Sequence, residues 1–180
     1  MAIPIITYSC LTSPVLIIDD SYYKNSPIDK PFVYVFNNKF LSVTREDDIP
    51  ILHGSDKSKI FIYKDSKLSQ IWLSKDATVN VEGGAISWIN LCDNSRAEIN
   101  GGIINWLLLS NKANAYLKKV KNLGWIFIRE DSKVHIYTNR YSYADGWLSG
   151  FWHDGSKFSF RIVFDRNMSN NTLYSNIIIH

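Results

Sequence analysis

Cysteine, methionine, proline and an excess of charge of one sign are all scarce in this sequence. Its 180 residues include 2 cysteines, 2 methionines and 5 prolines. Cys10 and Cys92 are far apart and show no metal-ligand spacing, so we expect reduced thiols, with a single disulfide as the alternative, and no metal or cofactor. The net charge is only +3. A strong polyanion-binding surface is therefore excluded, and nucleic acid is not an expected partner.

Long apolar runs are also missing. No segment approaches the roughly 20 apolar residues that span a bilayer, so we expect no membrane insertion. The N-terminus, "MAIPIITYSCLTSPVLIIDD", starts apolar but has no basic flank, and Pro4 and Pro14 interrupt it. This pattern does not indicate a secretory signal, and we therefore expect a cytoplasmic protein.

Apolar and aromatic residues are abundant. Hydrophobic residues make up 46% of the chain and aromatic residues 14%, with 6 tryptophans. This composition predicts a single folded domain with a substantial core, and it indicates that some aromatic rings face outward.

A repeat of 18 or 19 residues runs through the middle of the chain. Gly83-Gly84 is followed by Trp88, and the glycine pair at 101–102 is followed at the same distance by Trp106. The consecutive units are 58–76, 77–94, 95–112 and 113–131, and a fifth begins at 132. Each contains two short bursts of alternating apolar residues, the pattern of half-buried strands, with one further apolar residue between them.

Units this short cannot bury their own apolar rows, so they must stack as coils of a parallel β-helix. A left-handed β-helix would need a hexapeptide period that is missing here. We therefore predict an all-β, right-handed parallel β-helix (β-solenoid) of about 5–6 coils, capped at both ends. The glycine pairs and the corner residues Asp76, Asp93-Asn94, Asn111 and Asp131 are expected at turns, where they tolerate positive φ.

The single domain 1–180 divides into three parts. Residues 1–38 are expected to be an N-terminal cap or irregular first coils. Residues 39–137 form the β-helix coils, the first of them degenerate, with Leu41, Val43 and Ile51 inward. Residues 138–180 form a C-terminal cap with a β-hairpin around Asp154-Gly155 and a final strand-like run.

The motifs "DNSRAEINGG" and "WLSGFWHDGSKFSFRIV" resemble those of bacterial β-helical repeat proteins. In these proteins, DNSxxxI(N/S)GG-type coils precede an LxGxWxDGSxF-type terminal segment. The resemblance covers about residues 58–164. It implies a β-helix and an exported surface protein, and therefore an extracellular location, in contrast to the missing signal sequence; it implies no catalytic residues.

Strand alternation places large apolar residues on the outside of the second strand of each unit. The predicted binding residues for a protein partner or a second copy of the chain are Trp72, Trp88, Trp106, Leu108, Trp125 and Phe127. We expect Trp88, Trp106 and Trp125 to form a ladder about 10 Å long. The ladder either contacts a partner or belongs to the core beneath a chain terminus or segment 137–164, and sugar stacking is a third reading.

Catalysis has weaker support. Glu82 and Glu98 lie on neighbouring coils but in different columns, and acidic corner residues usually serve turns. We therefore predict a non-catalytic binding module, of the kind that a mobile element or pathogen of bacterial or phage origin uses to block a host component. The alternative is a carbohydrate-binding or glycan-cleaving β-helix, such as an adhesin or tail-spike-like protein.

Overall fold

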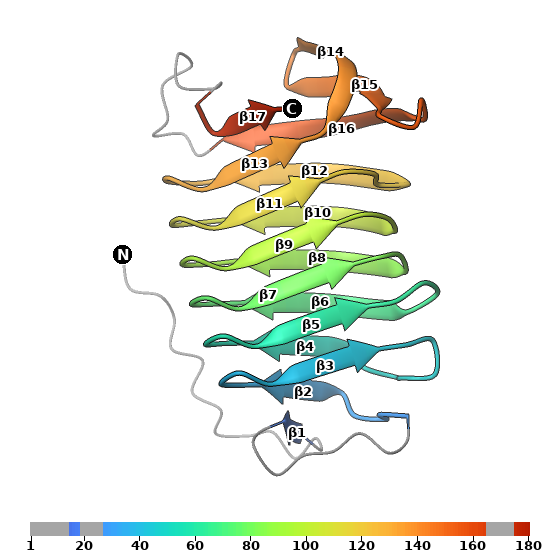
Figure 1. Ribbon diagram of the computed structural model, residues 1–180, viewed down its shortest axis with the longest axis vertical. Helices are drawn as coiled ribbons and strands as arrows, with labels where there is room; N and C mark the ends of the chain where they lie inside the picture. Colours follow the sequence, from blue (N-terminus) through green and yellow to red (C-terminus); the bar gives the residue numbers. More distant parts are fainter. Residues whose placement is uncertain (1–14, 19–26, 165–174) are drawn as a thin grey trace.

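The fold is a solenoid built from β-strands alone. The computed structural model describes residues 15–18, 27–164 and 175–180, and every regular element in these ranges is a strand. Two sheets, of ten and seven strands, enclose one apolar core (Figure 1). The predicted all-β solenoid is confirmed.

Consecutive strands alternate between the two sheets. The larger sheet contains, in spatial order, β1 (Val15–Ile18), β2 (Phe32–Val35), β4 (Ile51–Gly54), β6 (Lys67–Leu73), β8 (Ala85–Leu91), β10 (Ile103–Leu109), β12 (Asn122–Ile128), β16 (Lys157–Phe164), β15 (Trp147–Trp152) and β14 (Thr138–Ala144). The smaller sheet contains β17 (Ile177–Ile179), β13 (Lys133–Ile136), β11 (Asn114–Leu117), β9 (Arg96–Ile99), β7 (Thr78–Val81), β5 (Lys59–Ile62) and β3 (Phe40–Val43). Six strand pairs, from β2 and β3 to β12 and β13, therefore form successive coils.

The coils wind in a right-handed sense. In Figure 1 the strands of the smaller sheet run from left to right in front, and those of the larger sheet return from right to left behind them. The chain climbs from blue to red as it turns, which is the hand predicted from the sequence.

Each strand of a coil pairs in parallel with its equivalents in the neighbouring coils. Ile71, Ile89, Leu107 and Ile126 are in register on β6, β8, β10 and β12, and none of them is exposed. The alternation of apolar and polar residues thus turns into continuous inward columns, because equivalent residues of successive coils stack directly.

The isolated apolar residue between the two bursts belongs to the second strand. Ile104 and Leu107, three residues apart, both point inward from β10. Both can do so because the ladder between β10 and β12 skips Asn105 and Gly124, which interrupts the strict alternation of inward and outward residues there. From β6 to β12 the strands of the larger sheet are therefore seven residues long, whereas those of the smaller sheet from β5 to β13 have four.

The tight corners follow a positional rule that the residue types do not reveal. The non-glycine residues with φ between 55° and 59° at these corners are Asn37, Asp56, Lys75, Asp93, Asn111 and Glu130. The expectation of positive φ was correct for Asp93 and Asn111 but wrong for Asp76 and Asp131, whose predecessors adopt it instead. A ladder supports these corners: Asp93 Oδ2, for example, accepts a hydrogen bond from Lys75 N at 3.0 Å.

The N-terminal strands extend the larger sheet. β1 and β2 are its first two strands, so the irregular-coil interpretation applies to them, while residues 1–14 and 19–26 lie outside the described residues. The degenerate coil at 39–57 is present as β3 and β4. Its inward residue on β4 is Leu52, which is fully buried. The expectation that Ile51 points inward was wrong, because the inward position of this degenerate coil lies one residue later in the sequence.

The C-terminal hairpin is confirmed and closes the core. β15 and β16 are antiparallel around Gly155, whose φ is 83°. Trp152 and Phe160 point inward and are almost fully buried, and Trp152 Nε1 donates to the carbonyl oxygen of Val120 at 3.2 Å. β16 also pairs in parallel with β12, and β17 with β13, so both sheets continue to the C-terminal end.

Gly84 and Gly155 allow two effects of a glycine, its tolerance of positive φ and its lack of a side chain, to be measured separately. Their φ values are 84° and 83°, but a Cβ at Gly84 would lie 2.7 Å from Ser66 O, whereas one at Gly155 would meet nothing within 4 Å. Gly155→Ala should lower the free energy of unfolding by about 1 kcal/mol, the cost of a left-handed residue. Gly84→Ala should cost about 1–3 kcal/mol more, because adjacent coils must move apart. Urea unfolding followed by circular dichroism measures both, and equal losses would contradict close coil packing at Gly84.

The buried column at the tight corners alternates between serine and alanine. Ser58 Oγ and Ser95 Oγ are buried without a hydrogen-bond partner among the described residues, whereas Ser132 Oγ donates to Arg129 O at 2.6 Å. Ala77 and Ala113 already fill the same column. Ser58→Ala and Ser95→Ala should therefore leave the free energy of unfolding unchanged or raise it by up to about 1 kcal/mol, and Ser132→Ala should lower it by about 1 kcal/mol. Urea unfolding of the three variants checks this order.

Candidate functional site: an outward aromatic face

The aromatic face is the outward side of β6, β8, β10 and β12, and it consists of Trp72, Trp88, Trp106, Leu108, Trp125 and Phe127. Trp88, Trp106 and Trp125 are in register on successive strands. Their rings are stacked, with centroids 5.0 Å apart for the first pair and 5.4 Å for the second. The ladder expected from the repeat is therefore present.

The other three residues lie in the neighbouring column. Leu108 and Phe127 are paired in register, and the Phe127 ring stacks on Trp106 with a centroid distance of 5.5 Å. Trp72 is in the same column but is separated from Leu108 by the buried Asn90. Trp72 therefore joins the face beside the ladder and does not stack on the other tryptophans.

The face extends further toward the N-terminus than the sequence indicated. Trp72 stacks on His53 at 5.7 Å, and His53 in turn lies against Tyr34 at 4.9 Å. Phe32 and Ile51 continue the other column down to β2. The missed signal was the alternation in "FVYVF" and "ILH", which the degenerate period of the first coils concealed.

Arg161 caps the ladder at its C-terminal end. It is in register with Trp125, and its guanidinium carbon lies 4.7 Å from the centre of the Trp125 ring, a cation–π contact. Trp147 lies opposite Arg161 on β15 and is 45% exposed. The column of large side chains therefore continues from the solenoid onto the hairpin.

The hairpin does not cover the aromatic face. β16, β15 and β14 continue the larger sheet beyond β12 as its last three strands. Trp72 is 41% exposed, and Trp88, Trp106 and Trp125 are half-buried. Segment 137–164 is thus not the cover, and the described C-terminal strand β17 belongs to the smaller sheet. The other cover considered, a chain terminus, otherwise concerns residues 1–14 and 165–174, which lie outside the described residues.

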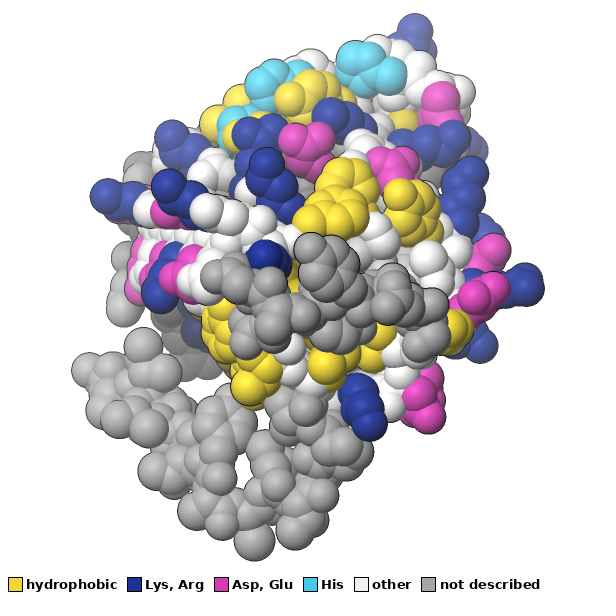
Figure 2. Space-filling model, turned by 60° about the horizontal axis from the view of Figure 1, so that its bottom comes forward, with side chains coloured by type: hydrophobic (Ala, Val, Ile, Leu, Met, Phe, Trp, Pro, Cys, Tyr) yellow, Lys and Arg dark blue, Asp and Glu magenta, His cyan; other side chains and the backbone are white. Residues whose placement is uncertain are grey.

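The outward side of the smaller sheet is more polar. In Figure 2, which brings the N-terminal end forward, Lys, Arg, Asp and Glu side chains are interspersed over the surface. Glu98 is held by Arg96 at 2.6 Å and Lys118 at 3.3 Å. Partial burial acts to raise the pKa of Glu98, but the bonds from Lys118 and Arg96 outweigh it and lower the pKa below its usual value.

Three of the remaining acidic residues considered for catalysis, Glu82, Asp76 and Asp93, are engaged locally. Glu82 Oε1 accepts a bond from Asn100 Nδ2 at 2.8 Å, and Asp76 Oδ1 accepts one from Asn94 Nδ2 at 3.2 Å. Asp93 belongs to the corner ladder. Across the described ranges, no three His, Cys, Asp or Glu side chains gather in a way that could hold a metal ion, and no helix could cross a membrane.

The half-buried Cys92 lies beside Ser110, whose Oγ is 3.4 Å from Cys92 Sγ. Cys10 lies outside the described residues.

No protein-family model, curated protein or solved structure matches the chain. The geometry of the aromatic face is therefore the basis for a functional proposal.

His53 should make stability depend on pH. Burial lowers its pKa below the ordinary value of about 6.5, so the unfolded chain binds this proton more tightly than the folded chain does. The free energy of unfolding should therefore be largest above that pH and fall as the pH is lowered through it. His53→Phe, which keeps a ring between Tyr34 and Trp72, should reduce the loss between pH 7 and 5.5. Urea unfolding at several pH values tests this, and an unchanged slope would contradict it.

Proposed function

We propose that the chain is a non-catalytic binding module that engages a protein partner, or a second copy of itself, through the aromatic face. The observation that carries the proposal is the in-register stack of Trp88, Trp106 and Trp125 on the outward side of the larger sheet, with the terminal hairpin beside it. Tryptophan is among the residues most enriched at the energetic centres of protein interfaces.

Adjacent coils can stack without rings between their outward positions. The coils are held by inward columns and by hydrogen bonds between strands, and the smaller sheet forms with Asn80 and Glu98 in register at its outward positions. Stacking adds stability to the coils, but it also holds the Trp106 ring in place between its two neighbours. A ring that is packed between two others loses less conformational entropy on binding than a free ring does, which favours its use as an anchor.

The chemistry of the face restricts the partner. The two outward columns from β2 to β16 contain two basic residues, Arg161 and His53. Neither column contains Asp or Glu. Such a surface favours an apolar, flat counterpart. A second copy of the chain provides one, because a twofold dimer places the same patch on both sides of the interface.

A role as a mobile-element or pathogen protein that blocks a host component fits a compact binding module and is proposed by analogy of class. A glycan-cleaving β-helix has less support. Glycan cleavage uses two carboxyl groups on either side of the scissile bond. Glu82 and Glu98 lie in different columns of the sheet, and each is already bonded to a neighbouring side chain.

Trp106→Glu tests the proposal. A charge in the middle of the ladder should dissociate a homodimer, or abolish capture of a partner, because a carboxylate would have to be desolvated in the interface. Light scattering measures the mass of the chain, and pull-downs with wild-type and variant baits compare captured proteins.

Tyr116→Glu is the matched control. Tyr116 is an outward, half-buried ring on β11 of the same coil, stacked on His135 on the smaller sheet. It should keep the wild-type mass and the wild-type partner. If Trp106→Glu loses cooperative melting, the ladder is core; if mass and capture both match the wild type, the face is not an interface.

A further inference from the structure

The hairpin carries a second surface with different chemistry. Three rows of residues cross β14, β15 and β16 on one side: Arg140, Phe151 and Lys157; Ser142, Ser149 and Ser159; and Ala144, Trp147 and Arg161. This side faces away from Trp152 and Phe160, which close the core.

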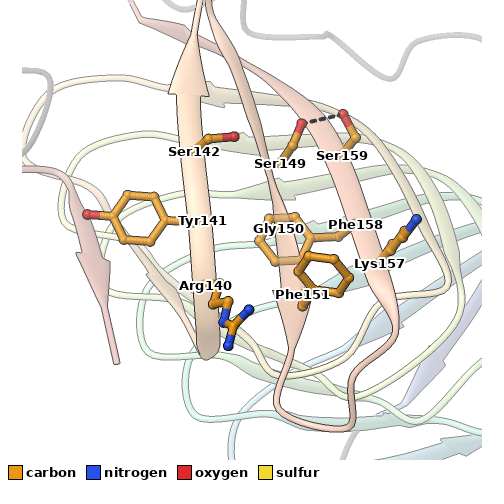
Figure 3. A pocket seen from close by; sticks show the side chains of 9 residues that line it. All are labelled: Arg140, Tyr141, Ser142, Ser149, Gly150, Phe151, Lys157, Phe158 and Ser159. Atoms are coloured by element: carbon orange, nitrogen blue, oxygen red, sulfur yellow. Dashed lines mark hydrogen bonds between the residues drawn. The ribbon is translucent and has the colours of Figure 1, made fainter.

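A hollow of about 580 Å³ lies between the first two rows. Figure 3 shows Arg140 and Phe151 toward one end and the serines toward the other, with the hydrogen bond between Ser149 Oγ and Ser159 Oγ at 2.9 Å. Gly150 lies between these rows, and strand alternation directs this position toward the buried Phe158 on the opposite side of the sheet, so no side chain separates the two rows there. The two rows can therefore act together on one ligand.

The hollow is cationic and partly aromatic. Strands β14, β15 and β16 contain Arg140, Lys157 and Arg161 but no Asp or Glu. Asp154, in the turn between β15 and β16, is paired with Lys119 at 2.6 Å. Phe151 is 39% exposed, and Lys157 Nζ lies 6.0 Å from the centre of its ring.

We propose that this hollow binds an acidic oligosaccharide, one that carries carboxylate or sulfate groups. Its anionic groups bind Arg140 and Lys157, as charge complementarity requires. A sugar ring packs its apolar C–H face on Phe151, and its hydroxyl groups bond to the serine row, because each serine hydroxyl both donates and accepts. Trp147 lies four residues from Phe151, about 13 Å along the strand, which exceeds a single sugar ring and favours an oligosaccharide.

A single-stranded nucleic acid would also use rings and cations, but its site needs a basic groove that follows several phosphates. Here the cationic surface ends at Arg161, whose guanidinium already lies over Trp125, and the aromatic face begins there. The observations therefore favour the saccharide. This site does not depend on the function proposed for the aromatic face.

Calorimetric titration of the full chain tests the proposal. The probes are an oligogalacturonate and a heparin-derived sulfated oligosaccharide, compared with maltohexaose and a short oligothymidylate. The wild type should bind at least one acidic saccharide, more weakly at higher salt, and should not bind maltohexaose. Phe151→Ala should weaken binding about tenfold, and the double variant Arg140→Gln with Lys157→Gln should abolish it.

Two controls make the result specific. Lys133→Gln removes an exposed cation from the smaller sheet and should bind as the wild type does. Trp106→Glu should also keep saccharide binding, which separates this site from the aromatic face. If another hairpin variant does not melt cooperatively, the single variant Arg140→Gln takes its place in the titration, because Arg140 is exposed and its substitution should leave the fold intact. The proposal is overturned if no acidic probe binds, if maltohexaose binds equally, if the oligothymidylate binds more tightly, or if folded hairpin variants match the wild type.

Discussion

Hydrogen bonding between coils is the interaction on which the rest of this structure depends. From β3 to β13 no strand bonds to the strand that precedes or follows it in the chain; each bonds to its equivalents one coil away. Equivalent residues must therefore stack. The aliphatic columns of the core, the carboxylate and amide ladder at the tight corners and the tryptophan ladder are three consequences of this one constraint.

The two sheets obey the same constraint with different chemistry outside. On the smaller sheet, stacking places Lys118 beside Glu98 of the preceding coil, which also binds Arg96 on its own strand, and it stacks Tyr116 on His135. On the larger sheet it brings rings together, and from Arg161 onward cations and hydroxyl groups join the rings. Both proposed sites thus lie on the larger sheet, which is the longer of the two because the hairpin extends it.

The sequence was sufficient wherever the period was regular. Strand positions, hand, inward residues and the stacked tryptophans between β5 and β13 follow from spacing and alternation. It was insufficient where neighbouring coils decide the geometry. Lys75 adopts positive φ although Asp76 suits that conformation better, because the position within the turn sets the angle. Tyr34 and His53 were missed because their coils are degenerate, and Arg140 and Lys157 were missed because antiparallel pairing, not the repeat, brings them together.

The reversal of strand direction at β15 has a consequence for self-association at the end of the solenoid. In spatial order the strands of the larger sheet are parallel as far as β16, and further parallel coils could be added to such a sheet indefinitely. β15 and β14 then run antiparallel to their neighbours, while the smaller sheet ends earlier, at β17. The C-terminal end therefore no longer matches the parallel two-sheet template of the N-terminal end, and end-to-end polymerisation into a fibre is disfavoured.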